Sequence, residues 1–385
     1  MYPALTTWLA LSEKLPDSLD TLWVGGEGGM EADLVKRAGI RFEAISAAGV
    51  HGVGWKALPG NVARLLRGYR SARTLLKEFK PDVLFFTGGF VAIPVAAAAF
   101  RKPAVLFVPD IEPALALTAL AFVSRKIAVT VQDSKNKYKA FLRKRLVVTG
   151  YPVRPEFKDY SRQNSLQKLG LSSELPVLLV SGGSKGARSI NRALLAALPD
   201  LLPAMQIVHL TGSLDWPLFK NFPGQARQEA LRSQQLVADY MDRYHPFPYL
   251  HEMGAALAAA DLVVSRAGAS SLGEYPHFGL PSILVPYPFA WKYQKVNAAW
   301  LQERGAALVI ADEELPAKLS KTVMDLLNDS ERLEAMRSAS KTLATPGAAE
   351  AIADLLIQSA HQDGSGRGAS SKDGGDERTL PGFVL

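Results

Sequence analysis

Short apolar runs alternate with helical patterns along most of this chain. The runs are rich in β-branched and aromatic residues and lead into glycine-rich turns, and the stretches between them repeat apolar residues at helical spacing. The predicted strands are Thr21–Val24, Asp82–Phe86, Ala104–Val108, Ile127–Thr130, Leu146–Thr149, Pro176–Val180, Gln206–Leu210, Asp261–Ser265 and Ser282–Val285. Predicted helices include Ala63–Glu78, Ser189–Ala197 and Met253–Ala260. Continuous apolar strands that alternate with helices are typical of doubly wound, parallel α/β sheets with both faces covered.

A polar interval divides this pattern in two. Residues 151–175 hold prolines and the polar run Ser161–Ser165, and a new strand–glycine–helix unit starts at Pro176. We therefore predict two Rossmann-like domains, over residues 1–154 and 155–360. From residue 361 onward Gly, Ser, Asp and Lys dominate, and such a composition cannot bury enough apolar surface to offset the entropy of ordering. Residues 361–385 are therefore predicted to form a disordered tail.

Composition excludes several kinds of chemistry and indicates a kind of partner. The chain has 385 residues without a cysteine, which excludes disulfides and cysteine nucleophiles, and its six histidines show no metal-binding spacing. Residues 1–154 carry 22 Lys and Arg against 12 Asp and Glu, whereas the rest of the chain carries 22 against 25. The basic first domain indicates an anionic partner, which could be nucleic acid, a membrane surface or a phosphorylated ligand.

One basic stretch has the spacing of an amphipathic helix. Arg64, Arg67, Arg70 and Arg73 recur every three residues with leucines between them, a pattern compatible with an anionic bilayer surface, although a solvated helix face also explains such runs. No recognised nucleic-acid-binding module accompanies the charge, so nucleic acid is not an expected partner. Because no signal peptide opens the sequence and the apolar stretch 83–100 is interrupted by glycine and proline, we expect a cytoplasmic protein that touches a membrane at most from one side.

The sharpest motif is the glycine-rich turn of residues 182–188, which follows the predicted strand at Pro176. Gly182 and Gly183 let a ligand approach the backbone, Ser184 adds a hydroxyl donor, and the free amides at the start of the next helix favour an anion. The turn matches neither the dinucleotide fingerprint nor a P-loop, because the Gly-Lys-Ser/Thr ending is absent. A tight strand-to-helix connection without a ligand is the alternative.

A second turn, Ser265–Glu274, follows another predicted strand and ends in a carboxylate. An acid in this position can accept hydrogen bonds from a sugar diol, or it can simply stabilise the helix dipole. Gln294 and Asn297 lie three residues apart after the last predicted strand, so their amides would share a helix face and could bind sugar hydroxyls, unless they are ordinary surface amides. Two such turns in one domain favour a nucleotide-diphosphate site.

The first domain offers two further strand ends. Thr87, Gly88 and Gly89 form a turn after the strand at Asp82, and Asp110 and Glu112 follow the strand at Ala104. Paired carboxylates at a strand end could supply a general base, although helix-capping acids before a proline are an equally good explanation.

These motifs, taken in order, resemble the MurG family of UDP-N-acetylglucosamine:N-acetylmuramyl-(pentapeptide) pyrophosphoryl-undecaprenol N-acetylglucosaminyltransferases. The resemblance spans Tyr2 to about residue 355. It rests on residues 2–5, 87–90, 149–154, 182–188 with Asn191, 265–274, 279–281, and 294 with 297–298.

The resemblance implies a GT-B fold, in which two Rossmann-like domains face a cleft, and an inverting transfer of N-acetylglucosamine from its UDP donor to a polyprenyl-diphosphate-linked muramyl peptide in peptidoglycan synthesis. It also implies a peripheral position on the cytoplasmic face of the cell membrane, an anionic inner-leaflet surface as a partner, and no obligatory metal or other cofactor. By position, the implied donor-binding residues are Arg154, Gly182, Gly183, Ser184, Leu250 (through its backbone), Ala269, Ser270, Ser271, Glu274, Gln294 and Asn297. The implied acceptor-side residues are Thr87, Gly88, Gly89, Asp110 and Glu112, and Asp110 is the candidate general base.

The sequence also departs from the family pattern. The family begins with a strand and a Gly-rich loop before the match at Tyr2, so we expect the first domain to lack both and the natural protein to be longer by them. Asp110 and Glu112 stand where the family usually has glutamate and asparagine, which makes the acceptor less secure than the donor. Two alternatives follow: a related UDP-sugar transferase with another lipid acceptor, and a nucleotide-sugar-binding protein without turnover.

Overall fold

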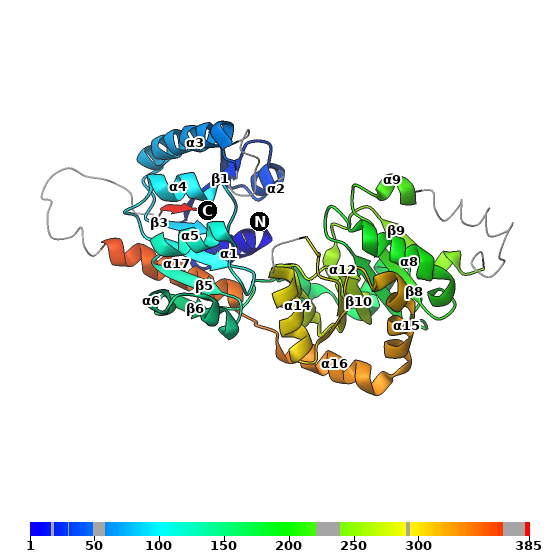
Figure 1. The fold of residues 1–385 in the computed structure, drawn as a ribbon. Coiled ribbons are helices and arrows are strands. Elements are labelled where there is room, and N and C mark those ends of the chain that lie inside the picture. Colours follow the sequence, from blue (N-terminus) through cyan, green and yellow to red (C-terminus); the bar gives the residue numbers. More distant parts are fainter. Residues whose placement is uncertain (17–18, 30, 49–57, 221–238, 290–292, 365–381) are drawn as a thin grey trace, which may run out of the picture. The chain divides into compact units, whose positions relative to one another are not determined.

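The computed structural model consists of two compact units, each built around one β-sheet (Figure 1). It describes residues 1–16, 19–29, 31–48, 58–220, 239–289, 293–364 and 382–385. Unit 1 comprises Met1–Arg154 with Pro346–Leu385, and unit 2 comprises Pro155–Thr345. Every strand pair recorded in the described parts is parallel, and helices cover both faces of each sheet, as predicted for doubly wound α/β domains.

Unit 1 contains a seven-stranded sheet in the order β2-β1-β13-β3-β4-β5-β6. Its strands are β1 (Asp20–Gly26), β2 (Arg41–Ile45), β3 (Val83–Phe86), β4 (Ala104–Val108), β5 (Lys126–Val129), β6 (Leu146–Val148) and β13 (Gly382–Val384). Its helices are α1 (Tyr2–Lys14), α2 (Glu31–Arg37), α3 (Leu58–Phe79), α4 (Ala92–Ala98), α5 (Leu115–Val123), η1 (Gln132–Lys137), α6 (Ala140–Arg143) and α17 (Ala348–Gly364).

Two helical layers enclose this sheet. Helices α3, α4, α5 and α6 contribute Ala72, Val95, Leu120 and Leu142 to one buried cluster with the strands. Helices α1 and α17 pack on each other, and α17 also contacts β3 and β4, so this pair covers the opposite face (Figure 1). The core therefore sits above and below strands whose side chains are buried on both sides.

The end of the chain corrects the predicted domain map. Residues 346–360, assigned above to the second domain, belong to unit 1, and α17 continues to Gly364 within the predicted disordered tail. Strand β13 lies between β1 and β3, where Phe383 and Val384 are buried. The Gly382 amide donates to Asp82 (2.8 Å) and the Val24 amide donates to the Leu385 carbonyl (3.0 Å). Composition misses this strand because a short apolar end gains its stability only from distant partners; residues 365–381 lie outside the described residues.

Unit 2 contains a six-stranded sheet in the order β12-β11-β10-β7-β8-β9. Its strands are β7 (Val177–Ser181), β8 (Gln206–Leu210), β9 (Tyr244–Phe247), β10 (Leu262–Ser265), β11 (Ser282–Leu284) and β12 (Ala307–Val309). Its helices are η2 (Pro155–Asp159), α7 (Arg162–Leu169), α8 (Arg188–Leu201), α9 (Trp216–Phe219), η3 (Met241–Arg243), α12 (Met253–Ala259), η4 (Ala269–Leu272), α13 (Glu274–Phe278), α14 (Tyr293–Glu303), α15 (Leu315–Asn328) and α16 (Ser330–Thr342).

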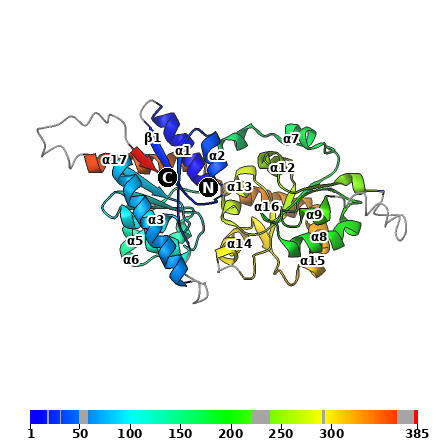
Figure 2. The ribbon, with the colours of Figure 1, turned by 90° about the horizontal axis from the view of Figure 1, so that it is seen from above.

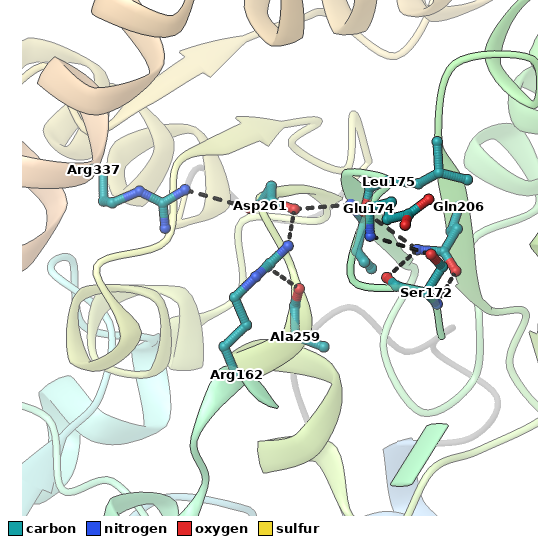
Figure 3. Close-up of polar contacts among 9 residues, drawn as sticks. Arg162, Ser172, Glu174, Leu175, Gln206, Ala259, Asp261 and Arg337 are labelled. Atoms are coloured by element: carbon teal, nitrogen blue, oxygen red, sulfur yellow. Dashed lines mark hydrogen bonds and ion pairs between the residues drawn. The ribbon is translucent and has the colours of Figure 1, made fainter. Parts of the chain in front are cut away.

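The polar segment after residue 155 belongs to unit 2 and is held there by hydrogen bonds. Ser161 caps α7 by accepting from the Asn164 amide (3.3 Å). Figure 3 shows Arg162 donating to the Asp261 carboxylate (2.8 Å) and to the Ala259 carbonyl, at the amino-terminal edge of the sheet. Polar contacts of α7 therefore stabilise this edge, which leaves the opposite, carboxyl edge for the glycine-rich turns.

Four strands were not predicted: β2, β9, β12 and β13. The first three are edge strands. Strand β2 is only partly buried and starts with an exposed arginine, and β9 contains Pro246, so their sequences lack the continuous apolar run of the central strands.

Candidate functional site

The two glycine-rich turns of unit 2 start side by side. Strands β7 and β10 pair in parallel, and Ser181, the last residue of β7, is in register with Ser265, the last residue of β10. Because β7 leads through α8 to β8 on its other side, the junction of β7 and β10 is a point where the strand order reverses. Such a junction is where open α/β sheets bind ligands beyond the carboxyl ends of their strands.

The first turn, residues 182–187, needs glycine for its backbone. Gly183 and Gly186 have φ angles of 85° and 84°, and a Cβ on Gly182 would lie 2.2 Å from the amide nitrogen of Ala187. The turn leads directly into α8, which begins at Arg188, so the first amides of this fourteen-residue helix face the same edge. Ser184 is exposed there. The turn can therefore present backbone donors and a hydroxyl to an anion.

The second turn carries the candidate acid. Ala269 and Ser270 begin η4, and the buried Ser271 donates from its hydroxyl to the Gly268 carbonyl (2.6 Å), which fixes the turn rather than leaving that hydroxyl free. Glu274 is the first residue of α13 and is partly exposed. The next residue, Tyr275, donates to the Ser265 hydroxyl (2.7 Å), and burial raises the pKa of Tyr275, so its phenol stays neutral. Glu274 is the carboxylate that follows this turn, at the first position of α13.

The two amides predicted on α14 differ in their surroundings. Gln294 is partly exposed, and its Oε1 accepts from the Tyr287 amide (2.9 Å), which leaves its NH₂ group as the donor toward a ligand. Asn297 is fully buried and donates to the Ala267 carbonyl (3.2 Å). The structure thus gives Asn297 a role in holding the β10 turn; a direct contact with a sugar stays a prediction for both residues.

A partly buried ion pair, Arg266 with Asp312, links these turns and was not predicted from the sequence. Arg266 donates to the Asp312 carboxylate, to the Val285 carbonyl (3.1 Å) and to the Ser189 hydroxyl (2.8 Å). Its guanidinium also lies 5.2 Å from the centre of the Tyr287 ring. Arg266 lies within a motif that the sequence showed, but its partners follow β11 and β12 or lie on α8, so no local signal identifies its role.

Two predicted donor-binding residues, Leu250 and Arg154, lie outside the two turns and α14. Leu250 follows β9 and is partly buried, on the same edge of the sheet as both turns. Arg154 is the last residue of unit 1, and its guanidinium stacks over the Tyr2 ring (4.7 Å to the ring centre). The structure thus places the other predicted donor-binding residues on the carboxyl edge of unit 2, and Arg154 in unit 1.

The predicted acceptor-side residues lie at the carboxyl edge of the unit 1 sheet. Thr87, Gly88 and Gly89 line a cavity of about 340 Å³, together with Glu31, whose carboxylate accepts from the Gly26 amide (3.2 Å). Gly88 and Gly89 have φ angles of 119° and 87°, which only glycine adopts readily. The cavity therefore lies over a glycine turn, whose backbone a ligand could approach closely.

The two predicted carboxylates lie after the neighbouring strand β4. Asp110 is partly buried, and Glu112 lies 3.8 Å from the Lys137 ammonium group. A role of Asp110 as the general base stays a prediction.

The described residues contain neither a metal-binding cluster nor a membrane-spanning helix. No group of three His, Asp or Glu side chains gathers there in an arrangement that could hold a metal ion. Among those residues no helix is long and apolar enough to cross a membrane.

Known proteins of one family match nearly the whole chain. Residues 2–109 match the glycosyltransferase family 28 N-terminal domain, and residues 177–352 match the glycosyltransferase family 28 C-terminal domain. A UDP-N-acetylglucosamine–N-acetylmuramyl-(pentapeptide) pyrophosphoryl-undecaprenol N-acetylglucosamine transferase of Roseiflexus sp. (strain RS-1) is 39% identical over 87% of this chain and 82% of its own length. The protein of the same name from Desulforudis audaxviator is 37% identical over 92% of this chain and 94% of its own length.

Solved structures agree with the fold. The crystal structure of Acinetobacter baumannii MurG superposes with a TM-score of 0.65 at 24% identity, over 92% of this chain and 96% of that one. The UDP-GlcNAc 2-epimerase of Neisseria meningitidis gives a TM-score of 0.54 at 14% identity, over 88% of this chain and all of that one. With parallel-sheet units, paired glycine turns and close relatives of one kind, the chain belongs to glycosyltransferase family 28 and, within it, to the MurG family of UDP-GlcNAc-dependent glycosyltransferases.

Proposed function

We propose that this protein moves N-acetylglucosamine from UDP-N-acetylglucosamine to a hydroxyl of a polyprenyl-diphosphate-linked muramyl peptide, the step that converts lipid I to lipid II in peptidoglycan synthesis. The observation that carries the proposal is the register of Ser181 with Ser265. It brings the turn before α8 and the turn before Glu274 to adjacent strand ends, within reach of one nucleotide diphosphate. The relatives named for this reaction support the choice of donor and acceptor.

The proposed reaction is a single displacement. The acceptor oxygen forms a bond to the anomeric carbon, the bond from that carbon to the UDP oxygen breaks, and UDP leaves with the bonding electron pair, which inverts the configuration. A general base takes the hydroxyl proton, and Asp110 is the candidate. Amides of residues 182–187 and the amino end of α8 would stabilise the charge that develops on the departing diphosphate. No step in this scheme needs a metal.

We also propose that unit 1 rests on the cytoplasmic face of the cell membrane. Arg64, Arg67, Arg70 and Arg73 are exposed along α3, together with Leu66, whose exposed fraction is 56%. Seen from above in Figure 2, α3 lies in front of the rest of unit 1. Gly68, on the inner side, allows α3 to approach the backbone of Ser46. A basic face with an apolar side chain suits anionic lipid headgroups.

A transfer assay with radiolabelled UDP-N-acetylglucosamine tests the proposal. We expect label to appear in the lipid fraction when the acceptor is a polyprenyl-diphosphate-linked muramyl peptide, with β configuration at the new bond. Transfer only to a different polyprenyl-linked sugar would identify the related UDP-sugar transferase. Binding of UDP without transfer to any acceptor would identify a nucleotide-sugar-binding protein without turnover.

The donor site has its own test in Glu274. Replacing it (Glu274→Ala) should weaken binding of UDP by about 1.5–3 kcal/mol, because the ribose hydroxyls lose a charged acceptor. Isothermal titration calorimetry measures the change. Asp325→Ala, which removes an exposed acid of α15 in the same unit, is the matched control and should bind UDP like the unchanged protein. Equal affinity in both variants would remove Glu274 from the site.

A further inference from the structure

A hydrogen-bonded network of buried polar side chains lies next to the turn of residues 182–187. His209, on β8, is fully buried, with its Nδ1 2.7 Å from the Tyr244 hydroxyl and its Nε2 3.0 Å from Oδ1 of Asn191. Asn191, on α8, is also buried, and its Nδ2 donates to the Thr211 carbonyl and to Asp215, each at 2.9 Å. This network thus connects the two strands β8 and β9 to the helix that starts at the turn.

The direction of each hydrogen bond follows from its partners. Both donors of the Asn191 amide point to acceptors, so its oxygen must accept, and the donor is the Nε2–H of His209. With one proton on Nε2, the neutral ring accepts at Nδ1 from the Tyr244 hydroxyl. Burial lowers the pKa of His209 to about 3, so the ring is neutral at physiological pH. Each hydrogen bond of the network therefore has one direction of donor and acceptor, which makes the network a rigid support.

The Thr211 and Asp215 end of this hydrogen-bonded network contacts both sides of the turn. Asp215 accepts from Arg188, the residue that follows the turn, through Nε (3.1 Å) and Nη2 (3.0 Å). On the other side, a Cβ on Gly186 would lie 2.2 Å from the Thr211 carbonyl oxygen, so the two backbones are in direct contact there. Asn191 binds both Thr211 and Asp215 and thereby sets the distance between the two supports.

We infer that His209 is a positioning residue for the diphosphate of the donor: through Asn191 it fixes Thr211 and Asp215, and these hold the amides of residues 182–187 in the geometry that binds the phosphates. The inference rests on the proposed function, because it takes the turn to be the diphosphate site. A core that needed only stability would be served by apolar side chains of the same volume, whereas a single arrangement of donors and acceptors fixes the position of a backbone.

The test compares two buried polar residues of the same strand. Gln206, at the opposite end of β8, is 3% exposed and bonds the Ser172 amide (2.7 Å) and carbonyl (2.9 Å), as Figure 3 shows. His209→Leu and Gln206→Leu should both lower the urea midpoint of unfolding, since each leaves buried partners unsatisfied. Only His209→Leu should weaken UDP binding, by about tenfold, because the His209 network contacts the turn and the Gln206 hydrogen bonds do not.

Comparison of ligands separates positioning from a general loss of structure. His209→Leu should bind uridine as well as the unchanged protein does, since the residues proposed for uracil and ribose, Leu250 and Glu274, lie outside the turn. Its KM for the donor should rise more than its kcat falls. His209→Gln, which keeps a donor toward Asn191, should restore most of the UDP affinity. If His209→Leu fails to fold, Tyr244→Phe, which removes the hydroxyl bonded to Nδ1, takes its place and should weaken UDP binding about threefold.

The outcomes distinguish this inference from the proposed function. UDP affinity equal in the His209→Leu and Gln206→Leu proteins, or equal losses for UDP and uridine, would overturn the positioning role. Failure of the unchanged protein to bind UDP would instead overturn the donor site itself.

Discussion

At the level of single residues, the structure separates side chains that can meet a ligand from those that hold the site. Ser184 and Glu274 are exposed or partly exposed at the two turns, whereas Asn297 is buried and bonds the Ala267 carbonyl. His209 is buried as well, and its ring is hydrogen-bonded to Asn191. The residue type alone does not tell these cases apart, because an amide or an imidazole serves equally well as a ligand or as a support.

His209 also predicts how stability depends on pH. Its pKa is lowered to about 3 in the folded protein by burial, whereas the unfolded chain has the ordinary value of about 6.5. Between these values the unfolded state binds more protons, so the free energy of unfolding should fall as the pH drops from about 6.5 toward 3, by up to about 1.4 kcal/mol per pH unit. Urea unfolding across this range measures the slope.

The matched variant for this measurement is His209→Gln, which does not titrate. Its slope should be smaller than that of the unchanged protein over the same pH interval. Identical slopes in the two proteins would show that His209 is not buried as a neutral ring.

At the level of elements, the turn before α8 depends on glycine for two different reasons. Gly183→Ala introduces only an unfavourable φ, since no atom lies within 4 Å of the new Cβ, and should cost about 1–2 kcal/mol. Gly186→Ala adds a clash with the Thr211 carbonyl at 2.2 Å and should cost clearly more. Urea midpoints of the two variants give the comparison, and equal costs would contradict the close contact of Gly186 with Thr211.

Helix α3 carries the prediction for the membrane. Changing Arg64, Arg67 and Arg70 together to glutamine should weaken binding to vesicles of anionic phospholipid by about 1 kcal/mol per residue and leave UDP affinity unchanged. Vesicle sedimentation measures the first and calorimetry the second. The control removes the same charge from unit 2 by changing Lys318, Lys321 and Lys341 to glutamine. A comparable loss of vesicle binding in the control would show that net charge, and not the α3 face, governs the interaction.

At the level of the whole molecule, unit 1 is assembled from both ends of the sequence. Strand β13 pairs with β1 and β3, and α17 packs on α1, so the last residues complete a sheet begun by the first. Phe383 is 1% exposed within it. Phe383→Ala should therefore destabilise unit 1 by about 3–5 kcal/mol, while the UDP affinity of unit 2 stays unchanged.

Denaturant unfolding followed by circular dichroism measures the cost of Phe383→Ala. Phe100→Ala, at a phenylalanine of the same unit that is 73% exposed, is the control and should change the midpoint little. Similar midpoints for the two variants would mean that β13 contributes no stability to the sheet.

The fold class, the central strands and the two glycine turns could all be predicted from the amino-acid sequence, because these features are local. Runs such as Val177–Ser181 are apolar throughout, and the glycines of residues 182–186 mark positions that other residues do not adopt. The order of the motifs also determined the family, since each is a short segment that can be compared without knowing what it contacts.

Which distant groups meet could be read only from the folded protein. It placed β13 inside the first sheet, put Ser181 opposite Ser265, and joined Arg266 to Asp312 and His209 to Asn191. Hydrogen bonds and burial between residues far apart in the chain leave no periodic trace in either segment, because each segment satisfies its own helix or strand pattern. A short apolar end in a polar, glycine-rich region is therefore a disordered tail by composition and a central strand in the folded protein.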